Sequence, residues 1–140
     1  MWHKGTLVAV ASALVAVGTG CAEKAVSFKQ DVHPILQKKC LSCHAPGGEG
    51  YAASGFSVET YESVTKGTKL GPVIVPGSSI SSTLVILIEH KADPSINMPR
   101  ARMQPLFEHE KYLKDWKVPI LPVEEIKQIR AWVDQGAKNN

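Results

Sequence analysis

The residues best suited to chemistry in this chain are two cysteines and a histidine in the run Cys40-Leu41-Ser42-Cys43-His44. Two thiols at this spacing, followed at once by an imidazole, are typical of covalent c-type haem attachment. The sulfurs of Cys40 and Cys43 reach one porphyrin edge and form thioethers with its two vinyl groups, while His44 lies under the ring as the proximal iron ligand. The alternatives are a disulfide between the two cysteines or half of a zinc site, but the chain lacks a second Cys/His pair at zinc-ligand spacing.

If His44 binds one side of the haem iron, a second residue can bind the opposite side as the sixth ligand. Met98 is the best-placed candidate for this role. Met98 lies far enough along the chain to pass round the ring, and Pro99 restricts its backbone to extended conformations. A thioether ligand stabilises ferrous iron and raises the reduction potential. The alternatives are Met98 as a core-filling residue, no sixth ligand, or a ligand from Met103, His33, His90 or His109.

The surroundings of these ligands are less clearly marked in the sequence. A proximal imidazole usually donates its second N–H to a carboxylate or a backbone carbonyl, which fixes the ring. Gly71-Pro72 is one source of such a carbonyl, and an ordinary turn is an equal alternative there. We expect His90 and His109 at the solvent-facing ends of helices. No acid, base or nucleophile constellation is evident, so we expect an electron carrier and not an enzyme.

Residues 1–20 have the character of an export signal. Lys4 precedes an apolar run from Leu7 to Val17, which is shorter than the about 20 residues needed to span a bilayer. The end of this segment, Thr19-Gly20-Cys21, resembles a bacterial lipoprotein signal, which implies a lipid on Cys21 and a tether over residues 21–26. A plain secretory signal that leaves Cys21 free and a buried helix are the alternatives. Either signal exports the chain, and we expect a periplasmic protein anchored to a membrane through Cys21.

The composition describes one small domain with little charge bias. A chain of 140 residues leaves one domain after the signal and tether, at residues 27–140. Hydrophobic residues make up 44% of the chain but aromatic residues only 6%, so the core is small and a large flat cofactor would enlarge it. The net charge is +3, with acidic and basic residues interspersed, which predicts no nucleic-acid partner.

The spacing of apolar residues predicts short helices and no strands, hence an all-α fold. We expect a helix that begins between Ser27 and Pro34 and delivers Cys40. The other predicted helices run from Ser57 to Lys66, from Ser78 or Ser79 to near His90, over a turn or two at 107–116, and from Pro122 to Gly136. Residues 45–55 are expected as a loop, 69–77 as extended chain and 93–105 as irregular chain.

In order along the chain, these motifs resemble the class I c-type cytochromes, and among them the planctomycete-type cytochrome c domain. The resemblance covers roughly residues 27–140 and implies a cytochrome c fold, with short helices packed around one covalently bound haem. It also implies His44 as proximal ligand, Met98 as distal ligand and electron transfer as the activity. The matching pieces are Phe28…Asp31-Val32-His33-Pro34-Ile35-Leu36, Cys40 to His44, Gly71-Pro72-Val73-Ile74-Val75-Pro76-Gly77, Ser82-Thr83-Leu84, Met98-Pro99 and Glu125-Ile126…Ile129…Trp132-Val133…Gly136-Ala137.

This chain departs from the family pattern on the distal side. Arg100 stands where the family often has a second proline, and residues 102–121 look like an insertion before the last helix. The sequence still predicts a periplasmic monohaem cytochrome that carries single electrons between redox proteins. The alternatives are a haem-based ligand sensor in which Met98 is displaced, and an electron-transfer subunit of a larger oxidoreductase.

Overall fold

The computed structural model describes residues 24–100 and 121–140. Every named element in these ranges is a helix, so the predicted all-α class is confirmed for them. The predictions for residues 1–20, Cys21, Met103, His109 and the turns at 107–116 lie outside the described residues. Within the described ranges, no helix combines the length and the apolar character needed to cross a membrane.

The first element is a short π-helix, η1 (Phe28–Val32), which continues directly into α1 (His33–Lys39). Its start at Ser27 is one of the predicted positions, and the Ser27 side chain accepts a hydrogen bond from a backbone N–H in the first turn. Pro34 lies in the first turn of α1, where its missing N–H breaks no helical hydrogen bond. The apolar face of η1 and α1 is buried, so the helix end at Cys40 is fixed relative to the core. This face consists of Phe28, Val32, Ile35 and Leu36.

The prediction of a loop over residues 45–55 is wrong in part, because a helix, α2 (Glu49–Ser54), lies within it. Two glycines delimit this helix. Gly48 precedes it with extended backbone, and Gly55 ends it with a φ of 76°, a conformation that favours glycine. The backbone N–H of Tyr51 donates to the carbonyl of Cys43 at 2.9 Å, so α2 is tied directly to the cysteine motif.

The next helix, α3 (Tyr61–Lys66), begins later than the predicted Ser57. Its start is set by a capping box, in which Thr60 and Ser63 exchange hydrogen bonds between side chain and backbone, both at 3.1 Å. Ser57 is buried instead, and its hydroxyl donates to the Glu59 carboxylate at 3.2 Å. The capping box therefore outcompetes Ser57 as the helix start.

The helix predicted from Ser78 or Ser79 to near His90 is two elements, η2 (Ser79–Ser81) and α4 (Thr83–Ile88). Ser82 separates them. Its side chain is fully buried, donates to the carbonyl of Ser78 at 2.8 Å and accepts from the N–H of Val75 at 2.8 Å. A serine that bonds the backbone in this way favours a helix boundary over a continuous helix.

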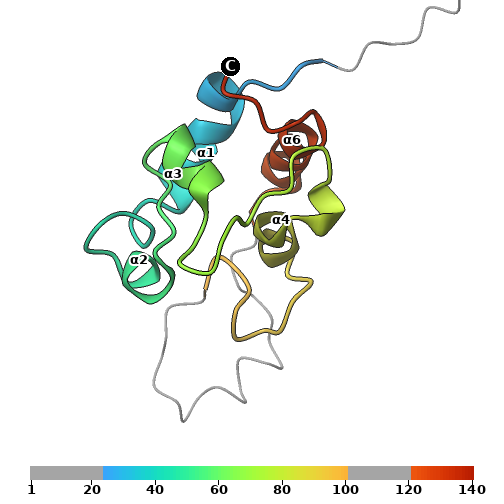
Figure 1. Ribbon diagram of the computed structural model, residues 1–140. Coiled ribbons are helices and arrows are strands. Elements are labelled where there is room, and N and C mark those ends of the chain that lie inside the picture. The colour runs from blue at the N-terminus through green and yellow to red at the C-terminus, as the bar shows by residue number, and fades with distance from the viewer. Residues whose placement is uncertain (1–23, 101–120) are drawn as a thin grey trace, which may run out of the picture.

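The last helix, α6 (Val123–Asp134), begins directly after Pro122, as predicted. Figure 1 shows α6 packed above α4 and beside the end of the chain that carries η1. Trp132 is at the centre of this packing, with its ring 5.3 Å from that of Phe28. The α6 side chains that complete the core are Ile129, Trp132 and Val133, each at most 1% exposed.

The two ends of the described chain are joined by a clasp, made of Val26, Phe28 and Lys29 on one side and Gln135 and Asn140 on the other. The Asn140 side chain accepts from the N–H of Phe28 at 2.9 Å and donates to the carbonyl of Val26 at 3.3 Å. The N–H of Lys29 donates to the backbone oxygen of Asn140 at 3.1 Å, and that of Val26 to the Gln135 side chain at 2.8 Å. The clasp holds η1 against the end of α6.

Candidate haem site

The cysteine motif lies at the end of α1, in a tight turn that continues the helix. The N–H of Cys40 donates to the carbonyl of Leu36 at 2.9 Å, and the N–H of His44 donates to the carbonyl of Cys40 at 2.9 Å. Cys43 donates to the same Cys40 carbonyl at 3.2 Å. These bonds hold the two thiols and the imidazole in one rigid turn, as attachment to a single porphyrin edge requires.

Both thiols of the motif are free. Cys40 is half-buried and packs against the core, whereas Cys43 is exposed. Burial raises the pKa of the Cys40 thiol to about 11, with smaller contributions from Cys43 and Glu125. A thiol with this pKa is protonated at neutral pH, which argues against a catalytic thiolate. No group of three or more His, Cys, Asp or Glu suited to a metal ion occurs in the described ranges, so the half-zinc-site alternative gains no support there.

The His44 imidazole is oriented by a backbone carbonyl. Its Nδ1 lies 3.3 Å from the carbonyl oxygen of Phe56, which only accepts, so Nδ1 carries the proton. The Phe56 ring also contacts the imidazole edge to face, with centroids 5.4 Å apart. Burial lowers the pKa of His44, although the bond to Phe56 opposes this shift, and the imidazole is therefore neutral at neutral pH. Nε2 is left as the nitrogen suited to iron.

Two glycines of the segment after the motif form a cradle around it. A Cβ on Gly50 would lie 2.7 Å from His44 Cε1 and 3.0 Å from His44 Nδ1. A Cβ on Gly48 would lie 2.4 Å from the carbonyl oxygen of Cys43. Only glycine permits this approach, and the imidazole is confined between Gly50 and Phe56. A neutral imidazole held by a carbonyl, next to two free thiols, fits the chemistry of c-type haem attachment.

The carbonyl that orients His44 comes from Phe56 and not from Gly71-Pro72, so that interpretation of the sequence is wrong. The carbonyl of Gly71 accepts from the N–H of Thr68 at 2.8 Å and closes a turn. An ordinary turn was the alternative prediction for Gly71-Pro72. Sequence reasoning missed Phe56 because a backbone carbonyl has no residue signature. The one available signal was the short spacing from His44 to a bulky apolar residue beyond the glycines.

Met98 is half-buried and packs against the same core cluster as Cys40. The end of α4 fixes its backbone on both sides. The N–H of Met98 donates to the carbonyl of Leu87 at 3.0 Å, and Nε2 of His90 lies 3.0 Å from the Met98 carbonyl, to which it donates. Figure 1 shows the segment after α4 looping below that helix and returning toward the side of α2. Met98 therefore lies on an irregular segment whose backbone is anchored on both sides.

The histidine alternatives within the described chain already have backbone partners. His33 stacks on Phe28 at 5.1 Å, and its Nε2 lies 3.0 Å from the carbonyl of Glu59. His90 is half-buried, so the expectation of a solvent-facing position is wrong; its Nε2 is engaged by Met98, which anchors the turn after α4. Met103 and His109 lie outside the described residues. Among the described residues, Met98 stays the predicted distal ligand.

Comparison with known proteins points to the same family. Residues 40–101 match the family described as planctomycete cytochrome C. The chain is also 24% identical over 135 residues to hydrazine synthase subunit alpha from Kuenenia stuttgartiensis, an alignment that covers 83% of this chain and 16% of that protein. No solved structure matches the chain.

The family match and the fold agree with each other. A cytochrome c domain implies haem binding and an electron-transfer role, and such domains are typically exported or periplasmic. The described residues form short helices without strands, in keeping with a cytochrome c-like fold. Residues 40–101, which begin at the first cysteine of the motif and include Met98, thus match the planctomycete cytochrome c family that the sequence motifs predicted.

Proposed function

We propose that this chain is a monohaem c-type cytochrome that carries single electrons between redox proteins. The observation that carries the proposal is the proximal arrangement: two free thiols and a neutral imidazole in one turn, with Nδ1 of His44 bonded to the Phe56 carbonyl. Cys40 and Cys43 would hold the haem covalently, and His44 and Met98 would ligate its iron. When bound, the haem supplies a one-electron couple between ferric and ferrous iron.

The protein residues orient the ligands and exclude water. The carbonyl of Phe56 and the Gly50 cradle restrict rotation of His44, while the end of α4 restricts Met98. A site whose ligands move little between oxidation states suits electron transfer. No intrinsic catalysis is part of the proposal.

A second function is favoured by one of the comparisons. The relative from Kuenenia stuttgartiensis is a subunit of an enzyme, and this chain corresponds to 16% of its length. A domain of this kind also serves as the electron-transfer unit of a larger oxidoreductase. Purification of the chain from its native source distinguishes the two cases, since a subunit stays with an oxidoreductase through gel filtration and a free carrier does not.

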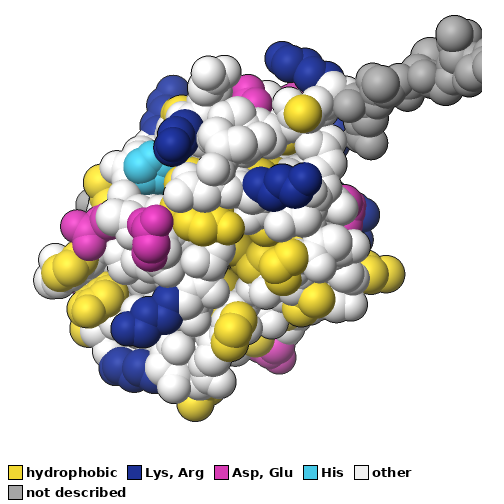
Figure 2. All heavy atoms as spheres, turned by 45° about the horizontal axis from the view of Figure 1, so that its top comes forward, with side chains coloured by type: hydrophobic (Ala, Val, Ile, Leu, Met, Phe, Trp, Pro, Cys, Tyr) yellow, Lys and Arg dark blue, Asp and Glu magenta, His cyan; other side chains and the backbone are white. Residues whose placement is uncertain are grey.

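The proposal places the protein outside the cytoplasm, in the periplasm, held to a membrane by a lipid on Cys21. Covalent haem attachment in the exported chain is the reason for this location. Its partners would be redox proteins that dock transiently, over a small area. On the face in Figure 2, acidic and basic side chains are interspersed and apolar side chains are exposed between them, a surface that does not favour nucleic acid.

The test is the mass and the spectrum of the exported full-length protein. We expect one haem that acid–acetone does not extract, and a ferric spectrum with the absorption of a thioether ligand. Met98→Ala should abolish that absorption, whereas Met103→Ala should keep it. Haem that is extracted by acid–acetone, or a mass without added tetrapyrrole, contradicts the proposal. Carbon monoxide binding to the native ferrous protein at neutral pH would support the ligand sensor instead.

A further inference from the structure

Glu125, in the first turn of α6, carries a carboxylate that is half-buried. Glu125 precedes Ile129 and Trp132 by one and two helical turns, and both are at most 1% exposed. Its Oε2 is buried and lacks a hydrogen-bond partner in the described part of the chain. A desolvated carboxylate oxygen without a partner is costly, which favours a compensating positive charge nearby.

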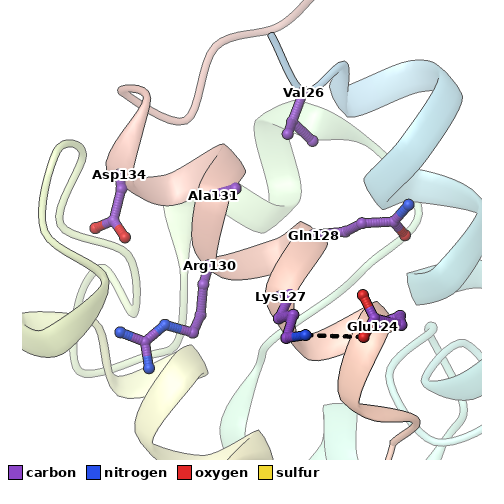
Figure 3. Close-up of a pocket in the computed structure, with 7 residues that line it drawn as sticks. All are labelled: Val26, Glu124, Lys127, Gln128, Arg130, Ala131 and Asp134. Atoms are coloured by element: carbon purple, nitrogen blue, oxygen red, sulfur yellow. Dashed lines mark hydrogen bonds and ion pairs between the residues drawn. The ribbon is translucent and has the colours of Figure 1, made fainter. Parts of the chain in front are cut away.

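The neighbouring carboxylate shows that helix capping does not explain this arrangement. Glu124 also lies in the first turn of α6, where a negative charge complements the helix dipole. Its side chain is 80% exposed, lies in the shallow groove of Figure 3 and pairs with Lys127 at 2.8 Å. A solvated glutamate therefore already complements the helix dipole, whereas Glu125 is half-buried.

Glu125 lies close enough to the cysteine motif to act on it electrostatically. Its negative charge contributes to the raised pKa of the Cys40 thiol, while Lys39 acts on the same thiol in the opposite direction. Ile126, the next residue of α6, packs against the core cluster that Cys40 and Met98 also border. The start of α6 and the attachment turn thus both border the desolvated core, in which charges interact more strongly than in water.

We propose that the haem iron is the missing counter-charge of Glu125, and that this carboxylate lowers the reduction potential of the site. This inference rests on the proposed function. A ferric haem core carries one more positive charge than a ferrous one, so a nearby carboxylate stabilises the ferric state. Removing it favours the ferrous state. Glu125 is a tuning residue that touches no substrate, and its effect is on the equilibrium between oxidation states.

The experiment compares Glu125→Gln with Glu124→Gln in the full-length haem-loaded protein, by spectroelectrochemical titration at one pH and ionic strength. At a given applied potential, we expect Glu125→Gln to raise the ferrous-to-ferric ratio about tenfold, which is about 59 mV for a one-electron couple. Glu124→Gln removes an equal charge from the solvated face and should change the ratio less than about twofold. The ligand absorptions should be the same in all three proteins.

A further variant and the haem content distinguish failure of this inference from failure of the proposed function. Glu125→Met removes the charge without leaving a buried amide, so it serves if Glu125→Gln does not fold, and we expect the same direction of shift. Equal ratios in the Glu125 and Glu124 variants overturn the inference while leaving the proposed function intact. A wild-type chain that attaches no haem overturns both.

Discussion

The glycine beside the proximal imidazole allows a prediction that follows directly from the structure. Gly50 lies within α2 with ordinary helical backbone, so its conformation does not require glycine. At an unhindered helical position, Gly→Ala stabilises a protein by about 1 kcal/mol. Here the added Cβ would lie 2.7 Å from His44 Cε1 and 3.0 Å from the carbonyl oxygen of Cys43. The Cys43 oxygen belongs to the backbone, and the imidazole is held by the carbonyl and the ring of Phe56, so the contact is not easily relieved.

The expected cost exceeds the gain in helix propensity. Overpacking of this kind costs about 1–3 kcal/mol. Displacement of the imidazole also weakens the 3.3 Å bond from Nδ1 to the Phe56 carbonyl, which is worth about 1 kcal/mol. After subtraction of the helical gain, we expect Gly50→Ala to lower the free energy of unfolding by about 1–3 kcal/mol. Because a weaker bond makes the imidazole less basic, the reduction potential should rise.

The assay is urea unfolding of the haem-loaded protein, followed by helical circular dichroism, together with the reduction potential. Ala53→Gly, at an exposed position of the same helix, is the matched control and should lose about 1 kcal/mol through propensity alone, with no change in potential. If Gly50→Ala gains about 1 kcal/mol and leaves the potential unchanged, the cradle around His44 is refuted.

Two further predictions concern the packing of α6. Burial raises the pKa of Glu89, but hydrogen bonds from Lys91 at 2.7 Å and from Arg130 outweigh it and hold that pKa below its ordinary value of 4.5. The stability that this carboxylate contributes is present above pH 4.5 and is lost as the pH falls through the lowered pKa. Glu89→Gln should therefore lower the free energy of unfolding by about 1–2 kcal/mol at pH 7. At the acid end of a stability–pH curve, the variant and the wild type should have nearly the same free energy of unfolding. Asn140→Ala removes the side-chain half of the clasp, and we expect a loss of about 1–2 kcal/mol in urea unfolding together with faster amide exchange at Phe28, whose N–H the side chain accepts at 2.9 Å.

The sequence was a good guide to the elements with strong local signals and a poor one where signals competed. α6 was predictable because its apolar spacing and its proline start agree. α3 was misplaced because Ser57 and Thr60 are both acceptable caps, and only the reciprocal bonds with Ser63 decide between them. α2 was missed because glycines normally indicate a loop, yet here they bracket and line a single helical segment.

The same contrast holds for the candidate site. The spacing of Cys40, Cys43 and His44 identifies the chemistry without any fold. The acceptor at Phe56 was not predictable, because every residue offers the same carbonyl and only the path of the chain selects one. The core-side position of Glu125 was predictable in principle from its register with Ile129, but the lack of a partner for its Oε2 among the described residues is a property of the packed structure.

The proximal contacts of His44 are local in sequence, and this has a consequence for the order of assembly. Its imidazole bonds to a carbonyl only 12 residues away, and the glycine cradle lies within the same stretch. Closing so short a loop costs little conformational entropy, whereas recruiting Met98 requires the chain to pass through α3 and α4 first. We therefore expect residues 40–56 to become native-like early during maturation and the Met98 segment to dock last. The thiols of Cys40 and Cys43 would then be accessible for haem attachment before the Met98 segment covers the site.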